Sequence, residues 1–139
     1  MTRIGQACLA LAFVAGMLAS NMQWASADPA YDVGMSAFSS TFTAKLGSPS
    51  GSYVCRTISE ANTNQTIVLG TMVITPGHYS ASGYRWAAGT WSGSGDHLRF
   101  SRQPFNTAQA QNGVNRAGRS SIRFVWNPKS QLTAWICTR

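Results

Sequence analysis

The β region of this chain begins with residues 51–58, GSYVCRTI, and ends with residues 131–138, QLTAWICT. The first run alternates Tyr, Val, Cys and Ile with other residues, which is typical of a half-buried strand. Cys55 lies in the first run and Cys137 in the last. A bond between them would tie together the two ends of an antiparallel meander, as a barrel that closes its edges requires.

Further β-prone runs separated by turn residues lie between these two segments. They are residues 66–75, 84–92, 97–103 and 119–126. Residues 66–75 are apolar on both faces, which predicts a strand that is covered on both sides. Six short strands joined by turns predict a mainly β fold, a small antiparallel meander that forms a barrel or a sandwich.

One helix is expected before the β region, with residues 28–50 as N-terminal helix and linker. Five apolar residues recur at steps of three and four and form one stripe: Tyr31, Met35, Phe38, Phe42 and Leu46. Asp28-Pro29 is typical of a helix start, and Gly47 with Pro49 of a stop. We expect this helix, over residues 31–46, to pack on the outer face of the strand at 66–75.

Residues 104–118 resist assignment to a strand. They are rich in Asn, Gln, Ala and Gly, and Asn112-Gly113 is a turn signal. A stretch of this length predicts either a mobile loop or a lid over a binding site.

The N-terminus has the features of a secretory signal over residues 1–27. Arg3 is followed by an uncharged apolar run at residues 7–19, and Ala25-Ser26-Ala27 offers small residues for cleavage. The apolar run is shorter than the roughly 20 residues that a membrane crossing needs. The mature chain, residues 28–139, is therefore expected to be secreted or periplasmic, without a transmembrane segment.

Two cysteines remain after this processing, Cys55 and Cys137. An exported chain meets an oxidising compartment, and an even number of cysteines favours pairing. We predict a disulfide that closes residues 51–139 into one β domain, with two unpaired thiols as the alternative. Closing a loop of about 80 residues is worth roughly 4 to 5 kcal/mol in the chain-entropy model.

The mature chain is strongly basic. Ten Lys and Arg side chains stand against four acids, a net charge of about +6 with neutral histidines. Such an excess steers a protein toward anionic surfaces, polymers or lipids, and it also keeps a small secreted protein soluble.

The chain also contains many large aromatic residues for its size, and several lie among arginines. These rings would either fill the core or form a stacking and charged surface for a ligand. The ligand-binding residues that this second interpretation predicts are Trp86, Trp91, Arg99, Arg102, Arg123 and Trp126.

The sequence offers no constellation typical of catalysis or of metal binding. Its mature acids are Asp28, Asp32, Glu60 and Asp96, and its histidines are His78 and His97. General acid–base chemistry needs two positioned groups, and zinc needs three or four ligands. The dipeptide Asp96-His97 suggests a catalytic pair, but neighbouring residues of a strand point to opposite faces. We therefore expect a non-enzymatic protein with no catalytic residue, no metal and no cofactor.

Two stretches resemble known proteins. Residues 51–55, GSYVC, are similar to the start of the β region in small exported bacterial proteins of unassigned role. Residues 89–91, GTW, followed by 95–100, GDHLRF, resemble the Gly-x-aromatic, Gly-Asp-x-Leu hairpin of lipocalin-like β-barrels. The resemblance loosely covers residues 51–139 and implies a barrel that holds an apolar ligand inside.

A second resemblance is to the bacterial membrane-bound and periplasmic inhibitors of c-type lysozyme. It rests on residues 53–55, YVC, residues 80–83, SASG, and the terminal Cys137. It implies that Ser82 reaches into the cleft of a lysozyme. The Lys-Gly pair that this family has on the following strand is absent; Ala88-Gly89 and Ser92-Gly93 lie in its neighbourhood.

These features together predict an exported binding domain for an anionic or apolar ligand. An anionic glycan, a lipid or an envelope protein is the expected partner, and nucleic acid is not expected. The alternative is a protein-interaction module, such as a lysozyme-type hydrolase inhibitor or a component of an envelope complex.

Overall fold

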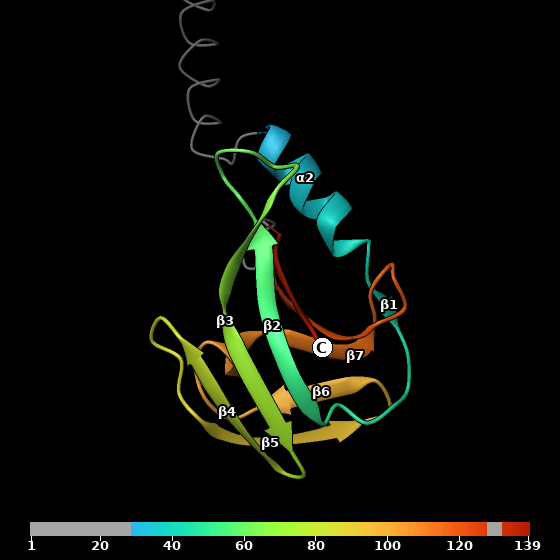
Figure 1. Ribbon diagram of the computed structural model, residues 1–139, viewed down its shortest axis with the longest axis vertical. Coiled ribbons are helices and arrows are strands. Elements are labelled where there is room, and N and C mark those ends of the chain that lie inside the picture. The colour runs from blue at the N-terminus through green and yellow to red at the C-terminus, as the bar shows by residue number, and fades with distance from the viewer. Residues whose placement is uncertain (1–28, 128–131) are drawn as a thin grey trace, which may run out of the picture.

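The computed structural model describes residues 29–127 and 132–139 (Figure 1). The predicted secretory signal, residues 1–27, lies outside the described residues, as do residues 28 and 128–131. The elements are α2 (Pro29–Ser39), β1 (Thr43–Ala44), β2 (Gly51–Ile58), β3 (Thr66–Thr75), β4 (His78–Gly83), β5 (Gly89–Ser94), β6 (His97–Phe100), the 3-10 turn η2 (Phe105–Thr107), β7 (Gln109–Val114), β8 (Ser120–Trp126) and β9 (Thr133–Thr138).

Strands β2 to β9 form a closed antiparallel barrel. Each strand pairs with the next along the chain, and β9 pairs back onto β2, so the meander has no open edge. The short β1 pairs with one end of β7, with Thr43 opposite Val114. The predicted mainly β meander is therefore confirmed, and of its two forms it is the barrel. Among the described residues no helix combines the length and the apolar character that spanning a membrane requires.

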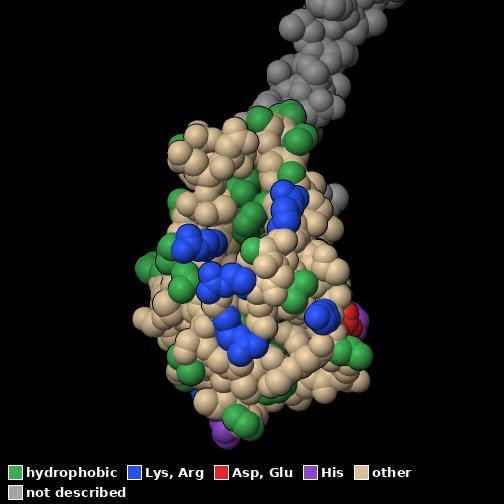
Figure 2. Space-filling model, turned by 45° about the vertical axis from the view of Figure 1, so that its right-hand side comes forward, with side chains coloured by type: hydrophobic (Ala, Val, Ile, Leu, Met, Phe, Trp, Pro, Cys, Tyr) green, Lys and Arg blue, Asp and Glu red, His purple; other side chains and the backbone are tan. Residues whose placement is uncertain are grey.

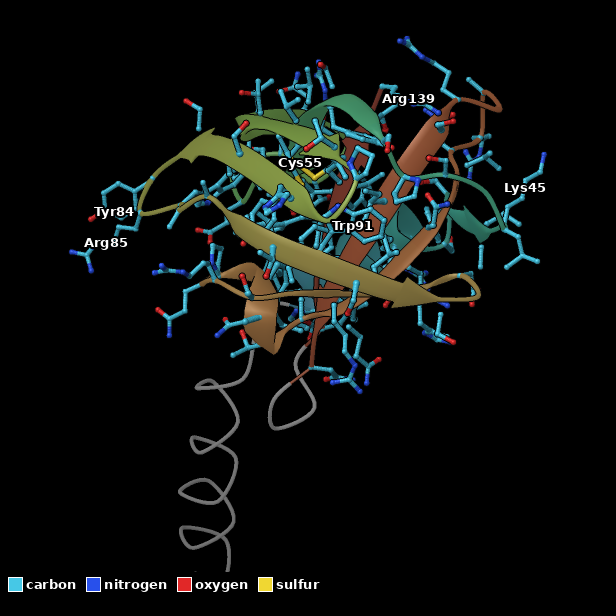
Figure 3. All side chains as sticks on the ribbon, turned by 90° about the horizontal axis from the view of Figure 1, so that it is seen from below. Lys45, Cys55, Tyr84, Arg85, Trp91 and Arg139 are labelled. Carbon is cyan, nitrogen blue, oxygen red and sulfur yellow. A yellow bond between two sulfur atoms is a disulfide. The ribbon has the colours of Figure 1, made fainter. Side chains whose placement is uncertain are left out.

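The disulfide joins the first and last strands of the barrel. Cys55 lies directly opposite Cys137 in the β2–β9 pairing, and their sulfur atoms are bonded. Both residues are fully buried, because their side chains point into the barrel (Figure 3). The predicted bridge is thus confirmed, and it is compatible with an extracellular or periplasmic protein.

Aromatic side chains fill the barrel interior. Phe105 is only 1% exposed, and its ring contacts five others, with centroids 4.8 Å away at Phe124 and 5.0 Å at Trp86. The remaining three are Tyr79, Phe100 and Trp135. Barrels of about eight strands leave an interior that side chains just fill, so this barrel has a packed core.

Residues 104–118 differ from the expected mobile loop or lid. They contain η2, which inserts Phe105 into the barrel, and β7, which pairs with β8 along its whole length. The Trp126 indole anchors the segment by donating to Pro104 O and Thr107 Oγ1, at 3.3 and 3.0 Å. The prediction was wrong because tertiary packing and pairing override a composition that resembles a loop.

Strand β4 was not predicted, and of the strand expected at residues 84–92 only residues 89–92 are in a strand, β5. Residues 78–83 have few β-prone side chains, and residues 84–88 connect β4 to β5. The Trp86 indole of this connection lies against Gly70 and Gly83, where any Cβ would collide with it. Glycine at these positions lets the ring fold back onto the barrel.

The helix is shorter than expected and covers other strands. It ends at Ser39 rather than at residue 46, since the following Ser and Thr residues are weak helix formers and β1 begins at Thr43. Met35 is fully buried against Ala134 of β9 and Ile58 of β2. The outer face of β3 therefore stays uncovered, with Val68 56% and Val73 41% exposed.

Removing the disulfide should destabilise the barrel. The sulfur bridge spans 82 residues of chain, so the double variant Cys55→Ala/Cys137→Ala should lose about 4 kcal/mol of unfolding free energy. Urea denaturation of the variant and the oxidised protein measures this loss. A difference below about 0.5 kcal/mol would contradict the role that we assign to the bridge.

Tyr53 should make stability fall at alkaline pH. Its hydroxyl donates to Pro49 O at 2.6 Å, and burial raises the pKa of the phenol, an effect that the nearby Arg139 charge partly offsets. A raised folded pKa means that the stabilisation is complete below the unfolded value near 10 and is lost as pH rises above it. Tyr53→Phe should lose about 1 kcal/mol at pH 7 but show a shallower decline between pH 9 and 11 in denaturation curves. An equally steep decline in the variant would assign the effect to other groups.

Candidate functional site

The outer face of the barrel at β2, β9 and β8 carries a row of basic and apolar side chains. Arg56 of β2 lies opposite Ile136 of β9, and Ile136 lies opposite Arg123 of β8. In the next row Val54 lies opposite Thr138. Directly opposed residues share a face, and the alternation that sends Cys55 inward sends these neighbours outward.

The turn between β7 and β8 adds two arginines to the same region. Asn115 holds this turn by accepting hydrogen bonds at Oδ1 from the backbone N–H groups of Ala117 and Arg119, at 3.0 and 2.9 Å. Its own N–H donates to Arg119 O at 2.9 Å. Arg116 and Arg119 are both exposed on this ordered turn.

Arg139, which follows β9, is held in place by its neighbours. Its backbone N–H donates to Ser120 O, and its guanidinium donates to Ser120 Oγ at 2.7 Å. The guanidinium also lies 5.9 Å from the centroid of the Tyr53 ring. These contacts direct a third cation toward the seam between β2 and β9.

Some of these residues line a groove of about 390 Å³. Three arginines (Arg56, Arg119 and Arg139) stand around a floor formed in part by Val54 and Ile136. The other lining residues are Phe38, Thr41, Asn115 and Thr138. Figure 2 shows this side of the molecule, with Lys and Arg side chains gathered on one face, apolar side chains between them and acidic side chains only at the margin.

None of the groove arginines has a carboxylate partner among the described residues. Within those residues the one contact at ion-pair distance joins His97 Nε2 to Asp96 Oδ1, at 3.5 Å, on β6 and the turn before it. Three cations without counter-charges repel one another and attract an anion placed between them. The groove is therefore suited to phosphate, sulfate or carboxylate groups.

The structure brings together two of the three predicted tryptophans. Trp86 and Trp126 both contact Trp135, with ring centroids 5.6 and 4.5 Å apart. All three are partly buried and pack on the core, and the Trp126 indole is hydrogen-bonded to the η2 segment. Their faces are used mainly for packing, which is the alternative that the sequence left open.

The other predicted residues do not contact Trp135, although Trp91 also is partly buried and packs on the core. Trp91 of β5 donates its indole N–H to Thr75 O at 2.7 Å, at the β3–β4 turn. Arg99 lines a gap between β6 and β7, whose pairing covers two residue pairs. Arg102 follows β6 and is exposed, while its backbone contacts the Tyr79 hydroxyl. A ligand role for these residues stays a prediction.

Arg123 lies beneath the C-terminal end of α2. Its guanidinium donates to Ser39 O, to Ser39 Oγ and to Gln111 Oε1, at 3.1, 3.2 and 2.6 Å, and lies 4.9 Å from the Phe42 ring centroid. Burial lowers the pKa of this guanidinium, and its Nε has no hydrogen-bond partner in the described structure. These contacts join the helix to β7 and β8.

Sequence reasoning missed Arg56, Arg119 and Arg139 because they are far apart in the chain. The signal that unites them is the pairing of the first and last strands, which places residue 56 opposite residue 136 once Cys55 is paired with Cys137. That register follows from the disulfide and strand alternation. The position of Arg119 depends on the β7–β8 hairpin; the strand at residues 119–126 was predicted, but its partner β7 and the turn were expected to be a loop.

The described residues contain no cluster of three or more His, Cys, Asp or Glu side chains arranged to hold a metal. Asp96 and His97 do contact each other, although they are neighbours in sequence, and the His97 side chain is 72% exposed. Exposure of this kind leaves the imidazole in water.

Comparison with protein-family models, with curated proteins and with solved structures finds no match to this chain. The resemblances to lipocalin-like barrels and to lysozyme inhibitors therefore stay predictions. Ser82, which the second resemblance singles out, is exposed near the end of β4, opposite Thr71.

Replacing Arg123 should destabilise the protein more than replacing an exposed arginine. Arg123→Met keeps the aliphatic stem but leaves Ser39 O and Gln111 Oε1 without their donor, which should cost about 1 to 3 kcal/mol of unfolding free energy. Arg99→Met, on the outer face of β6, is the matched control and should change stability by less than about 0.5 kcal/mol. Urea denaturation compares the two, and equal stabilities would show that the Arg123 contacts contribute nothing.

Proposed function

We propose that this protein is a non-enzymatic binding domain for an anionic ligand, and that its binding site is the groove of Arg56, Arg119 and Arg139. The observation that carries the proposal is the convergence of three arginines from three segments on one groove without an acidic partner among the described residues. Exposed guanidinium groups present several donors in a planar fork that matches phosphate, sulfate and carboxylate oxygens.

The filled barrel favours this outer site over an interior one. Apolar ligands of open barrels need internal space, whereas here Phe105 and its neighbours occupy the centre at near-complete burial. A ligand inside would have to displace a plug whose removal costs about 3 to 5 kcal/mol in cores of this kind. Of the two ligand classes expected from the sequence, the anionic one thus has better support.

A protein-interaction role is the second candidate, and it would use a different part of the surface. Tyr84 is 80% exposed, and the Arg85 guanidinium lies 5.2 Å from its ring centroid. Arg85 adopts a positive φ of 62°, which is uncommon for a residue other than glycine. Figure 3 shows both side chains projecting from the barrel, well away from Arg139. Variants in the groove therefore distinguish the two candidates.

Binding of dextran sulfate at several salt concentrations tests the anion-binding proposal. The triple variant Arg56→Gln/Arg119→Gln/Arg139→Gln should bind at least tenfold more weakly. Its slope of log affinity against log salt should fall by roughly 2, because fewer counterions are released. Thermal unfolding confirms that the variant is folded.

The matched control removes the same charge from another part of the molecule. Arg85→Gln/Arg99→Gln/Arg102→Gln lies outside the groove and includes two of the arginines that sequence reasoning predicted as ligands. This control should weaken dextran sulfate binding by less than about threefold. Equal losses of affinity in both variants would show that net charge alone determines dextran sulfate binding. A larger loss in the control would indicate that the site lies at Arg99 and Arg102.

A further inference from the structure

A second, apolar groove runs between α2 and the β2–β3 hairpin. It has a volume of about 640 Å³, and its apolar lining includes Val33, Ala37, Phe38 and Ile58. Val33 is 70% exposed, so the groove presents apolar surface to water. The helix is held close to the hairpin at Gly34, where a side chain would collide with Thr63, so the wall of the groove is fixed.

The apolar groove adjoins the arginine groove. Phe38 and Thr41 line both of them. The β7–β8 turn also serves both, since Arg116 lines the apolar groove and Arg119 lines the basic one. In Figure 2 apolar side chains lie between basic ones on this face. The surface therefore has a basic end and an apolar end joined at the C-terminal part of α2.

We infer that the ligand is an anionic amphiphile, a single molecule with a phosphate or similar headgroup and an alkyl chain. The headgroup binds among Arg56, Arg119 and Arg139, and the chain lies along α2 in the groove of Val33, Ala37 and Phe38. This inference rests on the proposed anion-binding function and specifies its ligand class. Charge complementarity identifies the headgroup end, and the apolar lining identifies the chain.

Only a ligand that is both anionic and apolar would use both the arginine cluster and the apolar groove. A plain polyanion would use the arginines but would leave the apolar groove exposed to water. An uncharged lipid would cover Val33 but would not use the arginine cluster. A second copy of this chain would bring more positive charge to a face that already lacks acids, which like-charge repulsion opposes.

Alkyl phosphates of increasing length provide the test. Butyl and octyl phosphate are titrated by calorimetry, below the concentration at which micelles form, into the protein purified after expression of the full chain. Each methylene placed against the groove should raise affinity by about two- to fourfold, so octyl phosphate should bind at least tenfold more tightly than butyl phosphate. Octyl glucoside, which has the same chain without a charge, should bind at least tenfold more weakly than octyl phosphate.

Variants in the apolar groove separate the chain from the headgroup. Val33→Gln/Ala37→Gln should reduce the advantage of octyl over butyl phosphate to less than about threefold while dextran sulfate binding stays as in the parent protein. Ser36→Gln/Ser40→Gln, on exposed positions of the same segment outside both grooves, is the matched control and should keep the full advantage. Thermal unfolding of both variants verifies folding.

The outcomes distinguish this inference from the function on which it rests. Equal affinities for butyl and octyl phosphate, with dextran sulfate binding still dependent on the three arginines, would overturn the amphiphile and leave anion binding in place. Tight binding of an acidic amphipathic peptide without any binding of alkyl phosphates would also overturn it. Failure of the triple arginine variant to weaken any anion would remove both proposals.

Discussion

The pairing of β2 with β9 is the interaction on which the rest of this structure depends. It converts a meander with two open edges into a closed barrel, and Cys55 and Cys137 form a covalent bond at its centre. The two sulfurs point inward, so the same alternation fixes which residues of both strands face outward. A shift of one residue would send Arg56 into the aromatic core, at a prohibitive cost for an unpaired charge. The bridge thus sets the register as well as the closure.

The barrel is closed and its interior is filled with side chains, and both facts limit where a ligand could bind. The interior is occupied by rings from four strands and from η2, with Phe105 at the centre of their contacts. Since side chains fill the core, a ligand would have to bind at the loops or at the outer surface. That surface is shaped by α2, which lies over β9 and β2 and forms walls on both sides of Phe38. A barrel architecture by itself says nothing of function, and these grooves are the surface features that a ligand could occupy.

The sequence predicted the parts of the fold that have strong local signals. Alternation in residues 51–58, the two cysteines and the turn residues were enough for a disulfide-closed meander with a helix before it. Two strands were missed where tertiary contacts outweigh local preference, and the helix end was misplaced because the apolar stripe was weighted above local helix propensity. Residues 78–83 and 109–114 pair as strands despite weak β propensity, and the helix ends at Ser39 because serine and threonine follow it. The arginines of the groove could not be found, because no local pattern relates residues 56, 119 and 139.

The arginine groove lies on the seam where β2 pairs with β9, so it forms only when the barrel is closed, although its residues are far apart in the sequence. Val54 and Arg56 come from the first barrel strand, and Ile136, Thr138 and Arg139 come from the last strand and its end. These two sets of residues meet only when the barrel is closed. Opening the seam would separate Arg56 from Arg139 and divide the floor between Val54 and Ile136. The charge cluster is therefore a product of closure, and a ligand that bridges both sides of the seam would in turn stabilise the closed barrel by mass action.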